Sequence, residues 1–217
     1  MKLTLYSYWR STSSWRVRIG LHWKELPFEY RAVNLLEGEQ YGEAHQARNP
    51  MSHVPVLEVE DGGRVLRLAQ SIAILEWLDE SVPARPLLPR DPEARARVRE
   101  IAEHVNSSIQ PYQNAAVLRW LKDRGADSAD WLARFVGGGL SRLEAAARPI
   151  AGRFACGDEV TLADLYVVPQ LYAGRRFGVD VARFPTLLRA EASCRSLEAF
   201  ARSEPGRQPD APPDEKR

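Results

Sequence analysis

Four consecutive hydroxyl residues, Ser11 to Ser14, stand near the start of this 217-residue chain, directly after Arg10. They follow a short apolar segment and open a segment with helical spacing. A strand-to-helix turn of this kind combines hydroxyl donors with backbone N–H groups that point outward, which suits an anion or a thiolate. The simpler interpretation is an ordinary helix cap, which explains one or two hydroxyls but not four.

No cysteine lies in this turn, because the chain has only two, Cys156 and Cys194. A hydroxyl can donate a hydrogen bond to a bound thiolate and so favour its charged form. Any sulfur nucleophile at the turn must therefore come from a ligand. The two cysteines form no CxxC pattern or His/Cys cluster, so we expect neither a disulfide framework nor a bound metal.

Two further segments are candidates for ligand contact. Pro55 stands just before an apolar strand, and a cis bond there would present the Val54 backbone to an extended peptide. Ser71 is a candidate N-cap beside Gln70, and the N-terminus of its helix suits a carboxylate. The simpler interpretations are a loop proline and a plain helix cap.

Arg175 and Arg176 stand near the end of the helix predicted to begin at Thr161. Their planar guanidinium groups could hold a substrate carboxylate in a bidentate manner. Cations also occur at helix C-termini because of the helix dipole alone. Adjacent helical residues differ in direction by about 100°, so either arginine could fill the role.

The elements that must position these residues divide the chain in two. The first part alternates strands and helices, and its βαβ start predicts parallel strands. Asp61-Gly62-Gly63 indicates a hairpin. The expected elements are strands at 2–8, 28–33, 56–59 and 65–68, and helices at 14–25, 40–48 and from Ser71 onward. This order predicts an α/β thioredoxin-like domain over residues 1–82.

Beyond this domain, four prolines within 83–92 indicate a linker. Every later long segment has helical spacing, which predicts an all-α domain over 93–217 with an irregular C-terminal tail. The expected helices are at 93–122 with a break at Pro111, at 128–148, from a capping box at Thr161 to Asp164, and at 186–202.

The composition is ordinary for a soluble globular protein, with 44% hydrophobic and 27% charged residues. A net charge of +1 without a basic tract argues against a nucleic-acid partner. No apolar run reaches membrane-spanning length, and the N-terminus indicates a strand rather than a signal peptide. We therefore expect a cytoplasmic protein with small-molecule ligands.

Taken together, these segments resemble the zeta class of glutathione transferases. The family signature is a Ser-Ser-Cys-x-x-Arg-x-Arg-Ile run, which stands here as Ser11 to Ile19. The resemblance covers nearly the whole chain in order. It continues through Asn49-Pro50-Met51, Val54-Pro55, Gln70 to Glu76, Ile109-Gln110-Pro111, Gln113-Asn114, Gly157 to Asp164, Val168-Pro169-Gln170, Arg176-Phe177 and Glu198-Ala199-Phe200.

The resemblance implies a glutathione transferase fold, a homodimer and glutathione as cofactor. It implies that Ser11 stabilises the glutathione thiolate and that Arg10 and Arg176 hold substrate carboxylates. The remaining residues implied to contact glutathione are Thr12, Ser13, Gln40, His53, Val54 through its backbone, Gln70, Ser71, and, from the helical domain, Gln110 and Asn114.

The implied activity is glutathione-dependent isomerisation of maleylacetoacetate to fumarylacetoacetate, a step of aromatic amino-acid catabolism. Alternatives are isomerisation of maleylpyruvate, glutathione transfer to α-haloacids, and a non-enzymatic glutathione-binding module. Two features depart from the family pattern. Ser13 replaces the usual cysteine, so no protein thiol can act there. Ala115-Ala116 lacks a hydroxyl often found in the family, which weakens one proposed contact, and lacks an arginine found in bacterial maleylpyruvate isomerases, which favours maleylacetoacetate.

Overall fold

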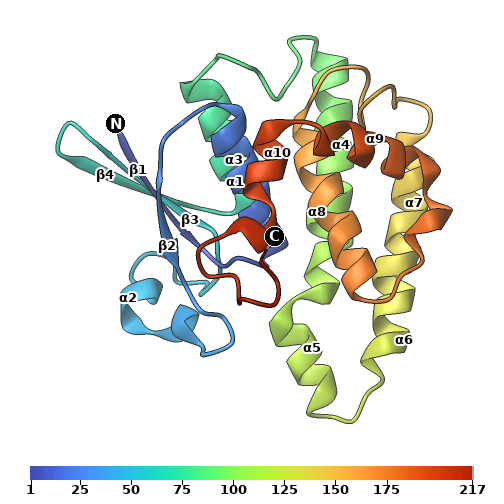
Figure 1. Ribbon diagram of the computed structural model, residues 1–217, viewed down its shortest axis with the longest axis horizontal. Helices are drawn as coiled ribbons and strands as arrows, with labels where there is room; N and C mark the ends of the chain where they lie inside the picture. The colour runs from blue at the N-terminus through green and yellow to red at the C-terminus, as the bar shows by residue number, and fades with distance from the viewer. Residues whose placement is uncertain (217) are drawn as a thin grey trace. The chain divides into compact units, whose positions relative to one another are not determined.

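The computed structural model describes residues 1–216, which form two compact units (Figure 1). The first unit contains Met1–Arg85 together with the segment from Leu197 onward, and the second contains Pro86–Ser196. The predicted division placed all of 93–217 in the helical domain. It was wrong for the last segment, because the side chains of that segment are bonded to residues of the first unit.

A four-stranded sheet forms the centre of the first unit, with the order β2-β1-β3-β4. Strand β1 pairs in parallel with β2, and α1 (Thr12–Trp23) supplies the crossover that parallel pairing requires. Strand β3 pairs antiparallel with both β1 and β4. The strands are β1 (Lys2–Ser7), β2 (Glu29–Ala32), β3 (Val56–Asp61) and β4 (Arg64–Ala69). The predicted βαβ unit and hairpin are confirmed.

Helices α1 and α3 (Ser71–Ser81) pack against each other beside the sheet, whereas the short α2 (Glu43–Gln46) lies away from them (Figure 1). Apolar side chains of the sheet and of both helices are fully buried, including Leu5 of β1, Ile19 of α1 and Leu75 of α3. A 3-10 turn, η1 (Glu39–Tyr41), precedes α2. The α/β, thioredoxin-like plan expected from the sequence is confirmed.

The C-terminal segment forms α10 (Glu198–Ser203), a 3-10 turn η5 (Pro205–Arg207) and an ordered loop. Helix α10 packs against α1, and the Trp15 indole Nε1 donates a hydrogen bond of 2.9 Å to Ser203 Oγ. The hydroxyl of Tyr30 donates to Asp210 at 2.7 Å. These bonds span most of the sequence and explain why the segment belongs to the first unit.

The second unit is helical, as expected. The helix predicted at 93–122 is interrupted at Pro111, as expected. The helix predicted at 128–148 contains a π-helical segment, Ala133–Gly137. Its elements are α4 (Pro92–Ser108), η2 (Gln110–Gln113), α5 (Ala115–Lys122), α6 (Ser128–Leu132), α7 (Gly138–Ala147), α8 (Leu162–Arg176), η4 (Val181–Arg183) and α9 (Pro185–Arg195). Helix α4 packs against α7 and α8, and α9 packs against the same two helices.

The capping box predicted at Thr161 begins α8. The carboxylate of Asp164 accepts hydrogen bonds from the Thr161 N–H at 2.8 Å, the Thr161 hydroxyl at 3.1 Å and the Ala155 N–H at 2.8 Å. All of these groups are buried, so the carboxylate satisfies donors that no water can reach. No helix among residues 1–216 combines the length and apolar character needed to cross a bilayer.

Candidate active site

The hydroxyl-rich turn begins α1, with Ser11 as its N-cap residue in an extended conformation. The Ser11 Oγ accepts a hydrogen bond of 3.2 Å from the Ser14 N–H. A hydroxyl that accepts in this way keeps its own proton to donate. The cap therefore fixes the oxygen of Ser11 and leaves a donor for a ligand at the positive end of the helix dipole.

The four hydroxyl residues of the turn differ in exposure. Ser14 is fully buried and Thr12 is 8% exposed, whereas Ser11 and Ser13 are half-buried. Within residues 1–216 the buried Ser14 Oγ has no hydrogen-bond partner. Ser11 and Ser13 are thus the two hydroxyls of this turn that a ligand reaches most easily.

A buried guanidinium holds the backbone that leads into this turn. Arg18 donates from Nη2 to the Trp9 carbonyl at 2.9 Å, from Nη1 to the Tyr8 carbonyl at 3.3 Å, and from Nε to the Ser203 carbonyl at 3.1 Å. The Tyr8 carbonyl also accepts from the Ser11 N–H at 3.0 Å. Arg18 therefore supports both the turn and the C-terminal segment.

The Val54–Pro55 peptide bond is cis, which decides between the two interpretations that the sequence left open for this proline. Val54 is buried, and neither its N–H nor its C=O makes a hydrogen bond to another group among residues 1–216. The preceding carbonyl, that of His53, is held at 3.0 Å by both Asn49 Nδ2 and His45 Nε2. The Val54 backbone is thus a donor–acceptor pair held ready for an extended ligand.

The start of α3 differs from its prediction. Gln70, with φ of 73°, occupies the N-cap position, and Ser71 is the first residue of the helix. The Ser71 hydroxyl is buried and accepts a hydrogen bond from Arg16 Nη1 at 3.2 Å. The prediction that Ser71 caps the helix was therefore wrong, because the chain enters α3 through the left-handed backbone of Gln70. The free N–H groups of the first turn still favour an anion there.

Gln40 lies in the short η1 turn and is 8% exposed. Its side-chain Oε1 has no hydrogen-bond partner among residues 1–216. A buried amide oxygen without a partner is costly, since burial removes its water. Gln40 therefore has an acceptor available for a ligand donor, such as an ammonium or amide group.

In the second unit, Gln110 begins η2 and Asn114 caps α5. The Asn114 Oδ1 accepts from the Ala116 N–H at 3.2 Å, which leaves its amide NH₂ group as a donor. Between them, Gln113 is buried and exchanges two amide hydrogen bonds with Gln170, at 2.9 and 3.3 Å. This pair, which the sequence analysis did not identify as structural, fixes η2 against α8.

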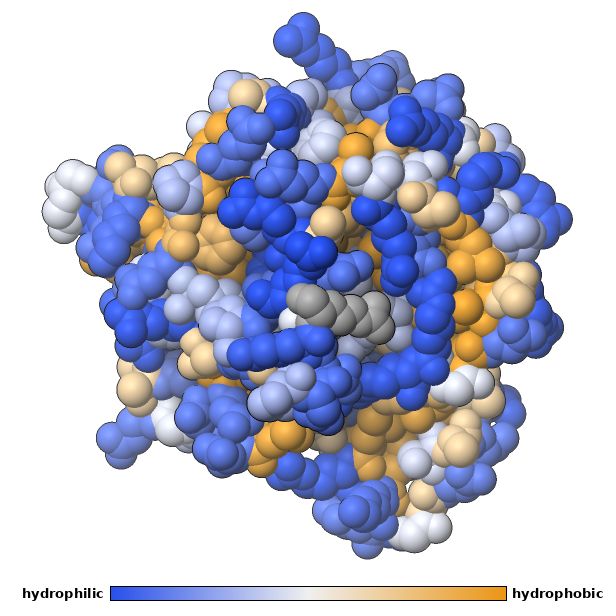
Figure 2. Space-filling view, viewed as in Figure 1, coloured by the Kyte–Doolittle hydropathy of each residue, from blue (hydrophilic) through white to orange (hydrophobic). Residues whose placement is uncertain are grey.

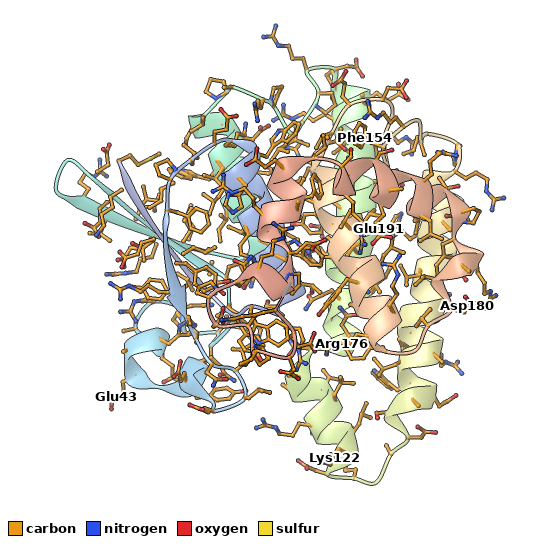
Figure 3. The ribbon with its side chains drawn as sticks, viewed as in Figure 1. Glu43, Lys122, Phe154, Arg176, Asp180 and Glu191 are labelled. Atoms are coloured by element: carbon orange, nitrogen blue, oxygen red, sulfur yellow. The ribbon has the colours of Figure 1, made fainter. Side chains whose placement is uncertain are left out.

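The structure distinguishes the two arginines at the end of α8. Arg175 forms an ion pair with the buried carboxylate of Glu191 on α9, with one hydrogen bond from Nη1 at 2.6 Å. Arg176 is exposed at the end of the helix, away from Glu191 (Figure 3), and its guanidinium carbon lies 4.4 Å from the Phe177 ring centre. Arg175 therefore has a structural role, and Arg176 lies beside Phe177 at the C-terminal end of α8.

Neither cysteine can supply a thiolate near neutral pH. Burial, together with the negative charge of Asp164 and Glu100, raises the pKa of Cys156 to about 12. Burial and the nearby Asp164 also raise the pKa of Cys194 far above its ordinary value. Among residues 1–216, no group of three or more His, Cys, Asp or Glu side chains is arranged to hold a metal ion.

Arg16, Arg18 and Asp210 support the site, and the sequence analysis assigned none of them a role, although the family signature contains Arg16 and Arg18. Arg16 and Arg18 flank Val17 inside an otherwise apolar, fully buried helix segment. Two charged residues at such positions are the signal that could have revealed them, because charge is buried only where it is paired. Asp210 accepts a hydrogen bond from the Trp9 N–H at 2.9 Å. The two residues are 201 positions apart in the sequence, so no local sequence pattern predicts this contact.

Comparisons with known proteins show the family of this chain. A family model described as "Glutathione S-transferase, N-terminal domain" matches residues 10–81. A zeta-class glutathione S-transferase of Euphorbia esula is 44% identical over 213 residues, which cover 97% of this chain and 93% of the relative. The chain belongs to the zeta class of glutathione transferases. The resemblance predicted from its motifs is confirmed.

Other members of this family carry isomerase names. Maleylpyruvate isomerase of Ralstonia sp is 42% identical, with 96% of this chain and 100% of the relative covered. Two solved structures of maleylacetoacetate isomerase from Anaeromyxobacter dehalogenans 2CP-1 are 57% identical, each with a TM-score of 0.91. One has glutathione bound in the active site and covers 97% of this chain and 98% of that chain. The other has dicarboxyethyl glutathione and citrate, with coverage of 98% and 98%.

The support that Arg18 gives to the turn predicts a specific loss on substitution. In Arg18→Met, the carbonyls of Tyr8, Trp9 and Ser203 lose a buried donor, so the free energy of unfolding should fall by about 3 kcal/mol or more. Urea unfolding measures this. The control is Arg31→Met, which removes an exposed ion pair with Glu29 and should cost less than about 1 kcal/mol. Equal losses in the two variants would contradict the role of Arg18.

Proposed function

We propose that this protein is a glutathione-dependent cis–trans isomerase that converts maleylacetoacetate to fumarylacetoacetate. The observation that carries the proposal is the Ser11 hydroxyl, which is fixed as a helix N-cap and keeps a proton to donate. Neither cysteine of the chain is a thiolate, so the nucleophile is a ligand's sulfur. Glutathione is the thiol that family membership indicates.

The residues of the first unit fit a peptide-like thiol. The Val54 N–H and C=O provide one donor and one acceptor, which matches an extended peptide unit. The α3 N-terminus at Gln70 and Ser71 suits a carboxylate of glutathione. The partnerless Oε1 of Gln40 suits its ammonium or an amide. Thr12, Ser13 and His53 are the further proposed contacts.

When bound, glutathione supplies a thiolate that adds reversibly to the activated cis double bond, so that rotation can occur before the thiolate leaves. Ser11 donates a hydrogen bond to the sulfur, which favours its charged form and lowers the thiol pKa. The dipole of α1 contributes in the same direction, by about 0.3–1 kcal/mol. Both effects make the nucleophile available near neutral pH.

Arg10 and Arg176 are proposed to hold the carboxylates of the substrate and to stabilise negative charge that develops during reaction. Arg10 is half-buried beside the Trp9 ring, with its guanidinium carbon 5.1 Å from the ring centre. Arg176 is exposed at the C-terminal end of α8, with its guanidinium carbon 4.4 Å from the Phe177 ring centre. Gln110 and the amide of Asn114 are proposed as donors to bound glutathione from the helical unit.

The relative that holds dicarboxyethyl glutathione supports the substrate class, because that compound joins the glutathione sulfur to a dicarboxylate. The Ralstonia relative favours a second candidate, maleylpyruvate, which would use the same residues. Glutathione transfer to α-haloacids remains an alternative that consumes the thiol. We further propose a cytoplasmic homodimer, in which the exposed Val65 and Leu66 on edge strand β4 are candidates for the covered surface.

The proposed activity predicts isomerisation that needs glutathione but does not consume it. The purified protein is given maleylacetoacetate or maleylpyruvate, with and without glutathione, while product and free thiol are measured. We expect fumaryl product with constant free thiol and a higher kcat/KM for maleylacetoacetate. Stoichiometric loss of thiol with chloroacetates, and no isomerisation of either maleyl acid, would instead establish the transferase alternative.

Substitution of the two arginines at the end of α8 separates binding from structure. Arg176→Ala removes a charged donor to a carboxylate, so KM for the maleyl acid should rise about 10- to 100-fold. Arg175→Ala should leave KM unchanged but lower the free energy of unfolding by about 1–3 kcal/mol, because the buried Glu191 carboxylate loses the closer of its two arginine partners and keeps only Arg195 at 3.4 Å. A larger rise of KM in Arg175→Ala than in Arg176→Ala would reverse the assignment.

A further inference from the structure

A cavity of about 560 Å³, open to solvent, lies on the surface of the first unit, where the C-terminal segment passes the end of α1. It is formed by side chains that are basic or neutral. Its lining residues are His22, Arg202, Gly206, Arg207, Gln208, Pro209 and Lys216. None of them belongs to the proposed glutathione or substrate residues, so the cavity has no role in the proposed reaction.

The charges around this cavity are unbalanced. Its described lining contains two arginines, a lysine and a histidine, but no carboxylate. The guanidinium of Arg202 lies 3.5 Å from the exposed carboxylate of Glu198, which neutralises part of its charge. Arg207 and Lys216 form no ion pair with any residue in 1–216. Figure 2 shows hydrophilic residues around the C-terminal segment on the face in view.

The wall of the cavity is an ordered turn. The Gln208 side-chain amide donates to the Arg202 carbonyl at 3.2 Å and to the Glu204 carbonyl at 2.8 Å. The Arg207 N–H donates to the Glu204 carbonyl at 3.1 Å. Asp210 lies two residues beyond Gln208 and accepts hydrogen bonds from the Trp9 N–H and the Tyr30 hydroxyl. The two arginines are thus carried by a backbone that is already folded, which reduces the entropy lost on binding.

The pKa of His22 is affected by burial and by the charges around the cavity. Burial, followed by the positive charges of Arg202 and Arg18, lowers the pKa of His22 to about 4, and Glu198 only partly opposes this. The ring also packs edge-on against Phe28, with 5.4 Å between the ring centres. His22 is therefore neutral at physiological pH, and an anion beside it would favour its protonated form.

We propose that this cavity binds a small multivalent anion, one that carries two or more carboxylate or phosphate groups. Arg207 and Arg202 present planar forks that match both groups, and Lys216 adds a third cation. A single monovalent anion would leave most of this charge uncompensated.

The His22 ring gives a direct test. Its NMR signals, assigned with His22→Gln, are followed in the full-length protein during titration with succinate or pyrophosphate at constant ionic strength. Saturable shifts and a rise of about one unit in the His22 pKa are expected with at least one probe. Succinate alone would indicate a carboxylate ligand and pyrophosphate alone a phosphate ligand. No saturable response to either would overturn the proposal.

Two matched variants separate this site from general charge attraction. Arg207→Gln removes one cavity cation and should weaken probe binding on the order of tenfold or more, measured by the His22 shift. Arg64→Gln removes the same charge from the β3–β4 hairpin, outside the cavity, and should leave the affinity unchanged. Equal weakening in both variants would mean non-specific attraction and would overturn the proposal, whatever the effect on glutathione-dependent turnover.

Discussion

The hydrogen bonds of one buried guanidinium connect the parts of the first unit. Arg18 lies in the middle of α1, yet its donors reach the carbonyls of Tyr8 and Trp9 before the helix and of Ser203 near the C-terminus. A buried cation requires such partners, because an unpaired charge in the interior is very costly. The same bonds determine the course of the chain into the hydroxyl-rich turn. The local geometry of Ser11 therefore depends on residues almost two hundred positions away.

This construction explains how a turn without cysteine can serve thiol chemistry. Ser11 is oriented by the backbone of Ser14, and that backbone belongs to a helix buried along its length. A donor fixed before the ligand arrives needs little reorganisation when charge develops on sulfur. Ser13, which replaces the family's usual cysteine, is only half-buried. The proposed mechanism does not require Ser13 to donate a hydrogen bond to the sulfur. In the proposed mechanism, the nucleophilic sulfur belongs to glutathione and the hydroxyl that activates it belongs to the protein.

Local patterns were sufficient for much of this fold. Alternation predicted the strands, Pro111 predicted the break after α4, and Thr161 with Asp164 predicted the start of α8. The errors arose where long-range contacts decide. The capping of α3 depends on the left-handed backbone of Gln70, and this conformation cannot be predicted from the residue type. The placement of the C-terminal segment depends on bonds such as Asp210 to Trp9, which join residues that no periodicity relates.

The central claim is that the Ser11 hydroxyl lowers the pKa of a bound thiol. The most direct test is the ultraviolet absorbance of the thiolate, followed as a function of pH with glutathione bound to the native protein and to Ser11→Ala. Because a hydrogen bond to a charged group contributes about 1.5–3 kcal/mol, loss of the hydroxyl should raise the thiol pKa by about one to two units. The Ser13→Ala variant should leave it unchanged. An unaltered thiol pKa in Ser11→Ala, with glutathione still bound, would contradict the account.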